Sequence, residues 1–390
     1  MKYIIEILCI LILSDFLLLA NDSDFYGGGG GVLFPVLNDQ ISVKREVLKI
    51  THRGNKTWIS DVRKENPITV EVDYLFFNHG KSTVLNIGFE AFLGGEEHDQ
   101  IPDIQQFTVL VNGKKVRAKP HLIDDTLDIT KRISWKNILQ IEPEQSYSNK
   151  RYVYLFKALM KKGFNRIKHR YKCFYTGMRV SYCANYSYDL FPALRWKNRK
   201  IEDFTLILDF DDLSQFTVDF MTRDDSKNWT MKGNGKLNFS NVNKTIDTNE
   251  YQDIPSTTIY IKKGIAIFKA KDFVPMNNLD IDLSNPITES HNYRRAELPL
   301  GRFYDSFFTD TYNYLDELFA EQNIMNISHR EKIIRNLPFA RRGYIFKDKM
   351  LLNYYINHTD WYKKDPTYKG SMGSFSSLEK DILKFNNHEY

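Results

Sequence analysis

The stretch "ITVEVDYLFFNHGKSTVLNIGFEAFL" (residues 68–93) decides how most of this 390-residue chain is expected to fold. In its first part every second residue is apolar: Ile68, Val70, Val72, Tyr74 and Phe76. The second part repeats the alternation with Leu85, Ile87, Phe89 and Ala91. Period-two alternation is typical of β-strands that bury one face. The polar segment 78–82 between them predicts a hairpin connection.

The same pattern recurs along the chain. It is found in "FTVLVNGKKVRA" (107–118), where Asn112-Gly113 is a two-residue turn signal, and in "EDFTLILDF" (202–210). "TTIYIKKGIAIFKA" (257–270) is interpreted as a further strand pair around Lys263-Gly264. Many short strands with intervening turns predict a mainly β fold, with an antiparallel β-sandwich-like body of one or two domains.

The predicted body covers residues 21–285. A sub-boundary is expected near 142–150 ("EPEQSYSNK"), and the polar, Asn-rich segment 225–253 is expected to be a long exposed hairpin or loop. Residues 286–302 are expected to link the body to a second unit.

From residue 303 to 387 the periodicity becomes helical, which predicts a small α-helical domain followed by a tail at 388–390. One helix is expected to begin near Thr309. Ser328 and Glu331 form the capping-box pattern S-x-x-E, and Ser376 with Glu379 repeats it. Asp348 is a candidate cap for the helix that follows it, and Pro338 is expected to end or kink its helix.

Residues 1–20 have the pattern of a secretory signal peptide. Lys2 precedes an apolar run, and Ala20 precedes the polar "NDSD", so cleavage is predicted after Ala20. An uncleaved membrane anchor is the alternative. No later run is long and apolar enough to span a membrane, so the mature chain is expected to have no transmembrane segment and to be secreted or periplasmic.

Two cysteines, Cys173 and Cys183, remain in the predicted mature chain. An oxidising compartment favours a disulfide between them, which would contribute about 3 kcal/mol by the chain-entropy model. Two buried thiols are the alternative.

The positive charge is concentrated near the carboxy terminus. Residues 325–370 contain ten Lys and Arg against four Asp and Glu, whereas the whole chain has a net charge of +5. A basic module attached to a nearly neutral body is therefore predicted.

The segment "RNLPFARRGYIFKDKMLLNYYINHTDWYKKDP" (335–366), with the later "SSLEKDILKF", resembles the YARHG domain, a small bacterial module without an assigned activity. The resemblance implies an extracellular location. The signature tyrosine, alanine, arginine, histidine and glycine fall on Phe339, Ala340, Arg341, Arg342 and Gly343. Tyrosine and histidine are thus replaced by Phe339 and Arg342, and a catalytic role of that histidine would be lost in this chain.

The body resembles an uncharacterised bacterial family of secreted proteins, a domain of unknown function with a β-rich fold expected. The resemblance rests on the mature start "NDS", on "GGGVLFP", "ISVKREVLKI" and "ITVEVDYLFFNHG", and on later blocks such as "AKDFVPMNNLDIDL", in the same order. It implies an exported protein with no established chemistry.

The sequence contains no strong catalytic signal. The glycines Gly27–Gly31 lack the Lys-Ser/Thr ending of a phosphate loop, no two histidines have metal-ligand spacing, and no G-x-S-x-G is present. Acidic pairs such as Asp211-Asp212 and Asp224-Asp225 are expected in turns. No metal, cofactor or catalytic residue is assigned, nucleic acid is not expected as a partner, and an enzyme is disfavoured.

The sequence favours non-catalytic binding, in which the module contacts an anionic cell-wall or envelope polymer. The candidate contacts are Arg341, Arg342, Lys347, Lys349, Lys363 and Lys364. For Arg341 an internal hydrogen-bonding role is an equal alternative, because its planar guanidinium suits several carbonyl oxygens. Residues expected to build the fold are Phe339, Ala340, Gly343, Tyr344, Phe346 and Trp361. An envelope hydrolase acting on polysaccharide or peptide and a structural or assembly factor remain open alternatives. Protein partners and oligomeric state are not predicted.

Overall fold

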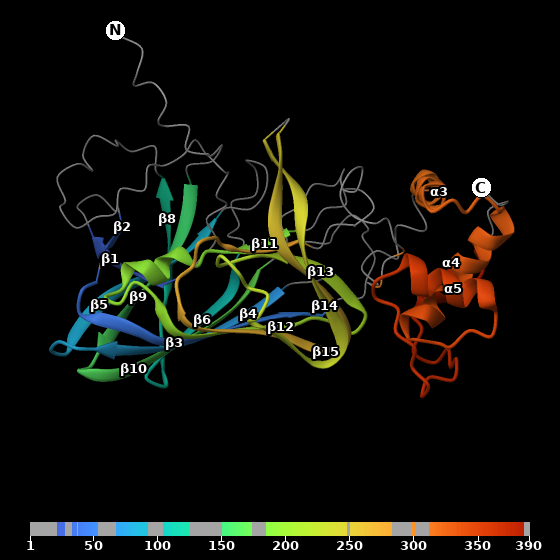
Figure 1. Cartoon of the computed structure of the whole chain (residues 1–390). Helices are drawn as coiled ribbons and strands as arrows, with labels where there is room; N and C mark the ends of the chain where they lie inside the picture. Colours follow the sequence, from blue (N-terminus) through green and yellow to red (C-terminus); the bar gives the residue numbers. More distant parts are fainter. Residues whose placement is uncertain are drawn as a thin grey trace, which may run out of the picture.

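The computed structural model describes residues 22–27, 33–36, 38–53, 68–92, 104–124, 150–173, 185–247, 250–282, 298, 300 and 312–385. Strands fill the body, and the four α-helices of these residues lie at the carboxy-terminal end (Figure 1). This confirms the predicted mainly β body with a small helical domain. None of the helices described is long and apolar enough to cross a membrane. The predicted signal peptide lies outside the described residues, as do almost all of segments 142–150 and 286–302.

The body contains a small antiparallel sheet of five strands in the order β2-β1-β5-β9-β8. Its strands are β1 (Asp22–Gly27), β2 (Leu33–Val36), β5 (Thr83–Phe92), β8 (Lys119–Asp124) and β9 (Lys150–Met160). The central strand β5 pairs with β1 on one side and with β9 on the other.

A second, larger sheet has the order β11-β16-β13-β15-β12-β3-β4-β10-β6-β7, with β14 paired to β15. Its strands are β3 (Ile41–His52), β4 (Ile68–Asn78), β6 (Gln105–Val111), β7 (Lys114–Val116), β10 (Gly163–Cys173), β11 (Asn185–Tyr188), β12 (Ile201–Asp209), β13 (Ser214–Asp219), β14 (Trp229–Asp247), β15 (Glu250–Phe273) and β16 (Leu279–Asp282). A short 3₁₀ helix, η2 (Phe191–Arg195), precedes β12. Among the strand pairs described, β3–β12 is parallel and the rest are antiparallel, as predicted for the body.

The stretch 68–93 does form two strands, but they do not pair with each other. β4 pairs with β3 and β10 in the large sheet, whereas β5 pairs with β1 and β9 in the small one. The predicted hairpin is therefore wrong, because segment 79–82 carries the chain from one sheet to the other. Alternation shows which face of a strand is buried, but it does not identify the strand's partner.

The two sheets pack face to face through aromatic side chains. From the small sheet, the Phe89 ring lies 5.5 Å and the Phe156 ring 5.6 Å from the ring of His169 on β10. Phe107 of β6 lies 4.8 Å from Tyr154 of β9. This layer of buried rings forms part of the single core of the body and makes this part of the fold a sandwich.

The 24-residue strand β15 pairs with different neighbours along its length. Residues 256–261 pair with β13, and residues 266–273 pair with β12. Between them Gly264 (φ +114°) lies opposite Gly233 of β14 (φ +128°), in a conformation that side chains disfavour. The prediction of a strand pair around Lys263-Gly264 is wrong, because residues 250–273 form one continuous strand. The Asn-rich segment 225–253 contributes β14 and the start of β15, and so the expected long hairpin is confirmed.

The predicted disulfide is not seen in the part of the chain that the structure describes. Cys173 ends β10 with its thiol buried and its Sγ 3.9 Å from the carbonyl oxygen of Ile68. Cys183 lies outside the described residues, so the pairing stays a prediction.

A buried histidine at the end of β3 makes the stability of the body depend on pH. Burial lowers the pKa of His52 from 6.5 to about 4; the charge of Asp211 opposes the shift and that of Arg53 adds to it. Between these two values the unfolded chain binds a proton that the folded chain does not. We expect the free energy of unfolding to fall by about 2 kcal/mol from pH 7 to pH 5 on this account. Urea unfolding of the His52→Gln variant should show a correspondingly smaller loss, and an unchanged loss would contradict the assignment.

The carboxy-terminal module contains α3 (Tyr312–Glu321), α4 (Ile327–Arg341), α5 (Lys349–His358) and α6 (Ser377–Ile382). Asp348 caps α5 by accepting bonds from the N–H groups of Met350 and Leu351, and Ser376 with Glu379 forms the predicted capping box. The other predicted box is wrong, because Asn326, not Ser328, caps α4. Pro338 lies inside α4, which ends three residues later, at Arg341.

The module has its own core, which continues into the body. Its largest buried residues include Phe319, Tyr354, Tyr355 and Trp361, and the same cluster contains Leu213 and Tyr260 of the body. The indole N–H of Trp361 donates to the carbonyl of Leu298 (2.6 Å), and the N–H of Leu300 donates to Gln215 Oε1 (3.0 Å). Residues between the two units therefore fasten the module to β13.

Candidate functional site

Arg342, a candidate surface contact, is buried. Each of its five N–H donors has an oxygen acceptor: Nε donates to Ser374 Oγ (2.9 Å), Nη1 to Pro338 O (2.7 Å) and Glu379 Oε1 (2.8 Å), and Nη2 to Ser374 O (2.9 Å) and Glu379 Oε2 (2.8 Å). The guanidinium also lies 4.3 Å from the centre of the Phe375 ring. A side chain so completely bonded builds the fold, and its prediction as an exposed cation is wrong.

Arg341 is also buried, and its Nη1 lies 3.7 Å from the same Glu379 carboxylate, whose side chain is fully buried. Burial alone would raise the pKa of Glu379. The hydrogen bonds from Arg342 and the charge of Arg341 outweigh it, so the pKa lies below its ordinary value. Arg341 and Arg342 thus join the end of α4 to the start of α6 through one carboxylate.

The residues expected to build the fold also have structural positions. Ala340, Phe346 and Trp361 are buried, and Phe339 and Tyr344 are partly buried against the module core. Gly343 follows α4 with a φ of +79°, as a left-handed helix end requires. A Cβ on this glycine would lie 2.3 Å from the carbonyl oxygen of Lys363 and 2.5 Å from Lys262 Nζ. These residues hold the module together.

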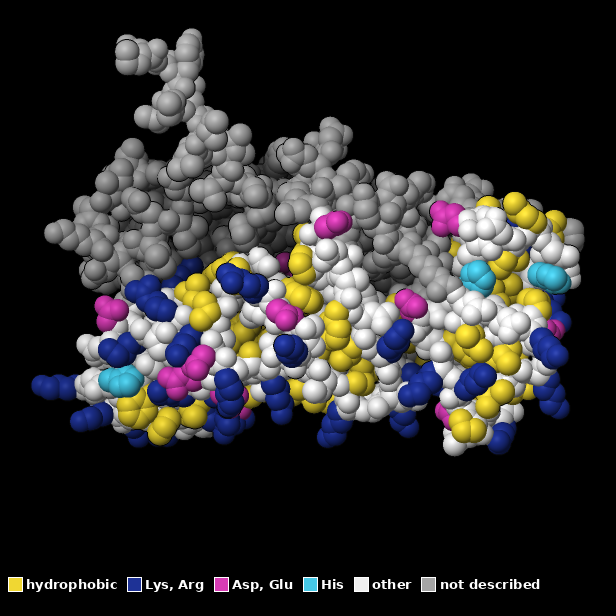
Figure 2. Space-filling model, viewed as in Figure 1, with side chains coloured by type: hydrophobic (Ala, Val, Ile, Leu, Met, Phe, Trp, Pro, Cys, Tyr) yellow, Lys and Arg dark blue, Asp and Glu magenta, His cyan; other side chains and the backbone are white. Residues whose placement is uncertain are grey.

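Of the six candidate contacts, the four lysines lie at the surface. Lys347, Lys349, Lys363 and Lys364 are exposed, and none makes an ion pair with a described residue. They come from two segments that lie side by side, because the N–H of Asp365 donates to Gly343 O (2.8 Å) and the Tyr362 hydroxyl donates to Tyr344 O (2.6 Å). We call these four residues the lysine surface. Figure 2 shows Lys and Arg side chains projecting from the module on the right of the view.

Partly exposed tyrosines lie beside the lysine surface: Tyr344, Tyr362 and Tyr368. The rings of Tyr344 and Tyr368 are 6.3 Å apart and nearly perpendicular. Partial burial raises the pKa of Tyr362 to about 12, and its hydroxyl donates to the carbonyl oxygen of Tyr344. Amphipathic rings next to cations suit a ligand that has both sugar rings and negative charges.

The body contributes further lysines where it meets the module. Lys236 Nζ of β14 donates to Asp360 O (3.0 Å), and Lys262 Nζ of β15 lies 3.8 Å from Asp365. Partial burial and the nearby charge of Lys363 lower the pKa of Lys262, although Asp365 opposes this. The sequence did not reveal this junction, because nothing in a local pattern links residue 262 to residue 365.

A buried polar cluster lies inside the body and was also not foreseen. Glu46 of β3 occupies an inward position of the alternation and is 0% exposed. Near it the hydroxyls of Tyr74 and Tyr188 are 3.2 Å apart. The pKa of Tyr188 is raised chiefly by burial, and also by Tyr74 and Glu46. The only sequence signal was the break in the apolar pattern of "ISVKREVLKI" at Glu46.

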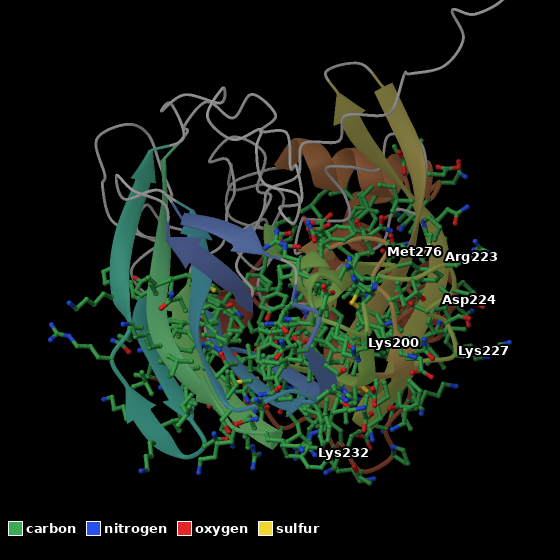
Figure 3. The ribbon with its side chains drawn as sticks, turned by 90° about the vertical axis from the view of Figure 1, so that its left-hand side faces the viewer. Lys200, Arg223, Asp224, Lys227, Lys232 and Met276 are labelled. Carbon is green, nitrogen blue, oxygen red and sulfur yellow. The ribbon has the colours of Figure 1, made fainter. Side chains whose placement is uncertain are left out.

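The described residues show turn geometry where sequence suggested it. Buried Asp225 accepts from Met221 N (2.6 Å), and Asp224 accepts from Ser226 N (3.0 Å). Figure 3 shows Asp224 at the surface with Arg223 and Lys227 nearby. Gly27 ends β1, and residues 28–31 lie outside the described part. Within that part, no group of three or more His, Cys, Asp or Glu side chains is placed to hold a metal ion.

Comparison with known families identifies the module. Residues 311–388 match the YARHG domain, which confirms the resemblance predicted from residues 303–387. The chain therefore carries a YARHG domain at its carboxy-terminal end. The match fits an exported bacterial binding protein, and it leaves the family of the body a prediction. No curated protein matches the chain.

Solved structures show weak overall likeness. A Legionella pneumophila protein, provisionally assigned as a nutrient binding protein, is 17% identical, with 93% of this chain and 98% of that chain covered and a TM-score of 0.46. The M1 zinc metallopeptidase of Deinococcus radiodurans is 13% identical, with 64% of this chain but only 43% of that chain covered and a TM-score of 0.24. At these TM-scores neither likeness bears on function.

Proposed function

We propose that this chain is an exported bacterial cell-envelope protein whose carboxy-terminal module binds an anionic envelope or cell-wall polymer without catalysis. The observation that carries the proposal is the lysine surface: four exposed lysines on adjacent segments that make no ion pair with a described residue. Long-range attraction would collect a polyanion there, and the neighbouring tyrosines would contact its sugar rings. The YARHG match and the predicted signal peptide support an extracellular site of action.

Charge reversal on the lysine surface tests the proposal. The triple variant Lys347→Glu, Lys363→Glu and Lys364→Glu should bind isolated cell walls at least about tenfold more weakly than the parent chain in about 0.1 M salt. Retention of the chain from residue 21 to residue 390 on sedimented walls measures this. Arg342 is left unchanged, because its replacement would damage the fold.

A matched control keeps net charge equal. Lys227, Lys232 and Lys269 are exposed on the body, and Figure 3 shows Lys227 at the right and Lys232 at the bottom of the view. Reversing these three lysines to Glu changes the net charge by the same amount and should leave wall binding within about twofold of the parent. Equal loss in both triple variants would indicate a nonspecific charge effect and would refute a localised site.

A further inference from the structure

One end of the body carries three chain connections close together. Segment 79–82 joins β4 to β5, residues 161–162 join β9 to β10, and Asn112-Gly113 turns β6 into β7. The first two pass between the sheets at the same end, because Asn78 pairs with Gly163 and Thr83 with Met160. In Figure 1 this end of the body lies at the left, and the helical module lies at the right.

Two buried asparagines hold the three connections in place. Asn78, 0% exposed, donates from Nδ2 to Met160 O (3.0 Å) and Lys81 O (3.0 Å). Asn165, 1% exposed, donates from Nδ2 to Lys161 O (2.7 Å) and accepts at Oδ1 from Asn112 Nδ2 (3.1 Å). Buried amides bonded on both sides make this end a preorganised surface.

Five lysines lie on these connections or at the start of β7: Lys81, Lys114, Lys115, Lys161 and Lys162. All are exposed, and none makes an ion pair with a described residue. The segments 79–82, 112–116 and 161–163 contain no Asp or Glu. We call this group of five the lysine end.

Exposed apolar side chains lie next to the lysine end on both outer faces of the sandwich. On the large sheet, Phe164 is 63% exposed and its ring lies 4.9 Å from that of Phe77. On the small sheet, Val84 (59% exposed) pairs with Leu159 (49% exposed). Figure 2 shows an apolar patch beside Lys and Arg side chains at the left end of the molecule. Exposed apolar patches rimmed by charge mark interaction sites.

We propose that the lysine end docks onto a lipid bilayer surface that carries anionic phospholipid headgroups. Lysines placed close to such a surface are attracted to it, and the adjacent Phe164, Val84 and Leu159 would enter the region between headgroups and acyl chains. A soluble anionic polymer satisfies the lysines but offers no apolar phase to these side chains, which is why the membrane surface fits better. This surface is separate from the lysine surface of the module, and the proposal does not depend on the function proposed above.

Vesicle binding tests the proposal. The chain from residue 21 to residue 390 lacks the apolar amino-terminal segment and should co-sediment with vesicles of phosphatidylcholine containing about one third phosphatidylglycerol. The triple variant Lys81→Glu, Lys161→Glu and Lys162→Glu should bind at least about 100-fold more weakly. Phe164→Ala should weaken binding about fivefold, because it removes apolar area without changing charge.

Three controls separate the outcomes. Two variants should bind the anionic vesicles with an affinity within about threefold of the parent: the charge reversal of Lys227, Lys232 and Lys269 and that of Lys347, Lys363 and Lys364. The parent chain should bind vesicles of pure phosphatidylcholine weakly. Vesicle binding that survives reversal of the lysine end would overturn the proposal. A second outcome would also overturn it. In that outcome the parent chain binds no vesicles but binds a soluble polyanion such as polyphosphate, and the lysine-end variant loses the polyanion binding. Circular dichroism of each variant verifies folding.

Discussion

Replacing Glu379 by Gln is expected to destabilise the carboxy-terminal module by about 3–5 kcal/mol, because the change leaves two buried guanidinium groups without their counter-charge. In the folded chain this carboxylate accepts from Arg342 Nη1 and Nη2, both at 2.8 Å, and lies 3.7 Å from Arg341 Nη1. Gln is nearly isosteric but can present only one acceptor oxygen and no charge. Hydrogen exchange of α4 and α6 in the full chain would report the loss locally.

The pKa of the same carboxylate determines how the stability of the module changes with pH. In the folded chain the pKa of Glu379 is lowered from the ordinary 4.5. The ionised carboxylate therefore contributes fully to the free energy of unfolding above about pH 4.5, and this contribution is lost as the pH falls through the pKa of the folded state. The Glu379→Gln variant should lack this acid-dependent loss. Asp381→Asn is the matched control, since Asp381 lies on the same helix and pairs with Lys384 (3.1 Å) at the surface. Asp381→Asn should lower the free energy of unfolding by less than about 1 kcal/mol. An equal loss in both variants would contradict a stabilising role of the buried contacts between Glu379 and the two arginines.

The second large effect is expected from Gly343→Ala, at about 3 kcal/mol or more. Two costs add: Ala disfavours the φ of +79°, and its Cβ would be 2.3 Å from the backbone oxygen of Lys363, which cannot rotate away. The new methyl would also lie 2.5 Å from Lys262 Nζ of the body. The substitution should therefore loosen the contact between module and body, which thermal unfolding of the full chain followed by circular dichroism would detect.

Two other glycines separate these costs. Gly113 has a φ of +82° with open space around it, so Gly113→Ala measures the backbone cost alone, about 1 kcal/mol. For Gly373 the nearest atom to an added Cβ is Ser371 Oγ at 3.6 Å, and Gly373→Ala should change stability by less than about 0.5 kcal/mol. If Gly343→Ala cost no more than Gly113→Ala, the packing at Lys363 would not be as tight as described.

Local signals in the sequence predicted local structure well. Asp348 and Ser376 cap the helices that they were expected to cap, because a side-chain oxygen beside the first turn needs no distant partner. Ser328 failed because Asn326, two residues earlier, takes the same role and starts α4 sooner. Alternation likewise predicted the buried faces of β4 and β5.

Long-range arrangement could not be predicted in the same way. The alternation of residues 68–93 is the same whether two strands pair with each other or enter different sheets, and they enter different sheets. The left-handed backbone of Gly264 lies opposite that of Gly233, 31 positions earlier in the sequence. Such contacts become visible only when the strand order is known.

The candidate site shows the same difference between local signals and contacts that are distant in the sequence. Arg342 was predicted to be a surface cation, and Arg341 either a contact or an internal hydrogen-bonding residue, because their partner Glu379 lies 37 residues or more away and a basic residue with a distant acceptor looks like an exposed one. Lys347, Lys349, Lys363 and Lys364 are exposed as expected. Arginine's planar fork suits buried pairing, whereas lysine's ammonium favours water, so exposure divides the candidates by residue type.

The salt dependence of cell-wall binding tests the lysine surface most directly. If this surface is the attachment point, the affinity of the parent chain should fall steeply as salt is raised from about 0.05 to about 0.5 M, and the Lys347, Lys363 and Lys364 reversal should both weaken binding and flatten that dependence. The Lys227, Lys232 and Lys269 reversal should reproduce the parent curve. The proposed function would be contradicted if the parent chain and the lysine-surface variant bound cell walls with the same affinity and the same salt dependence.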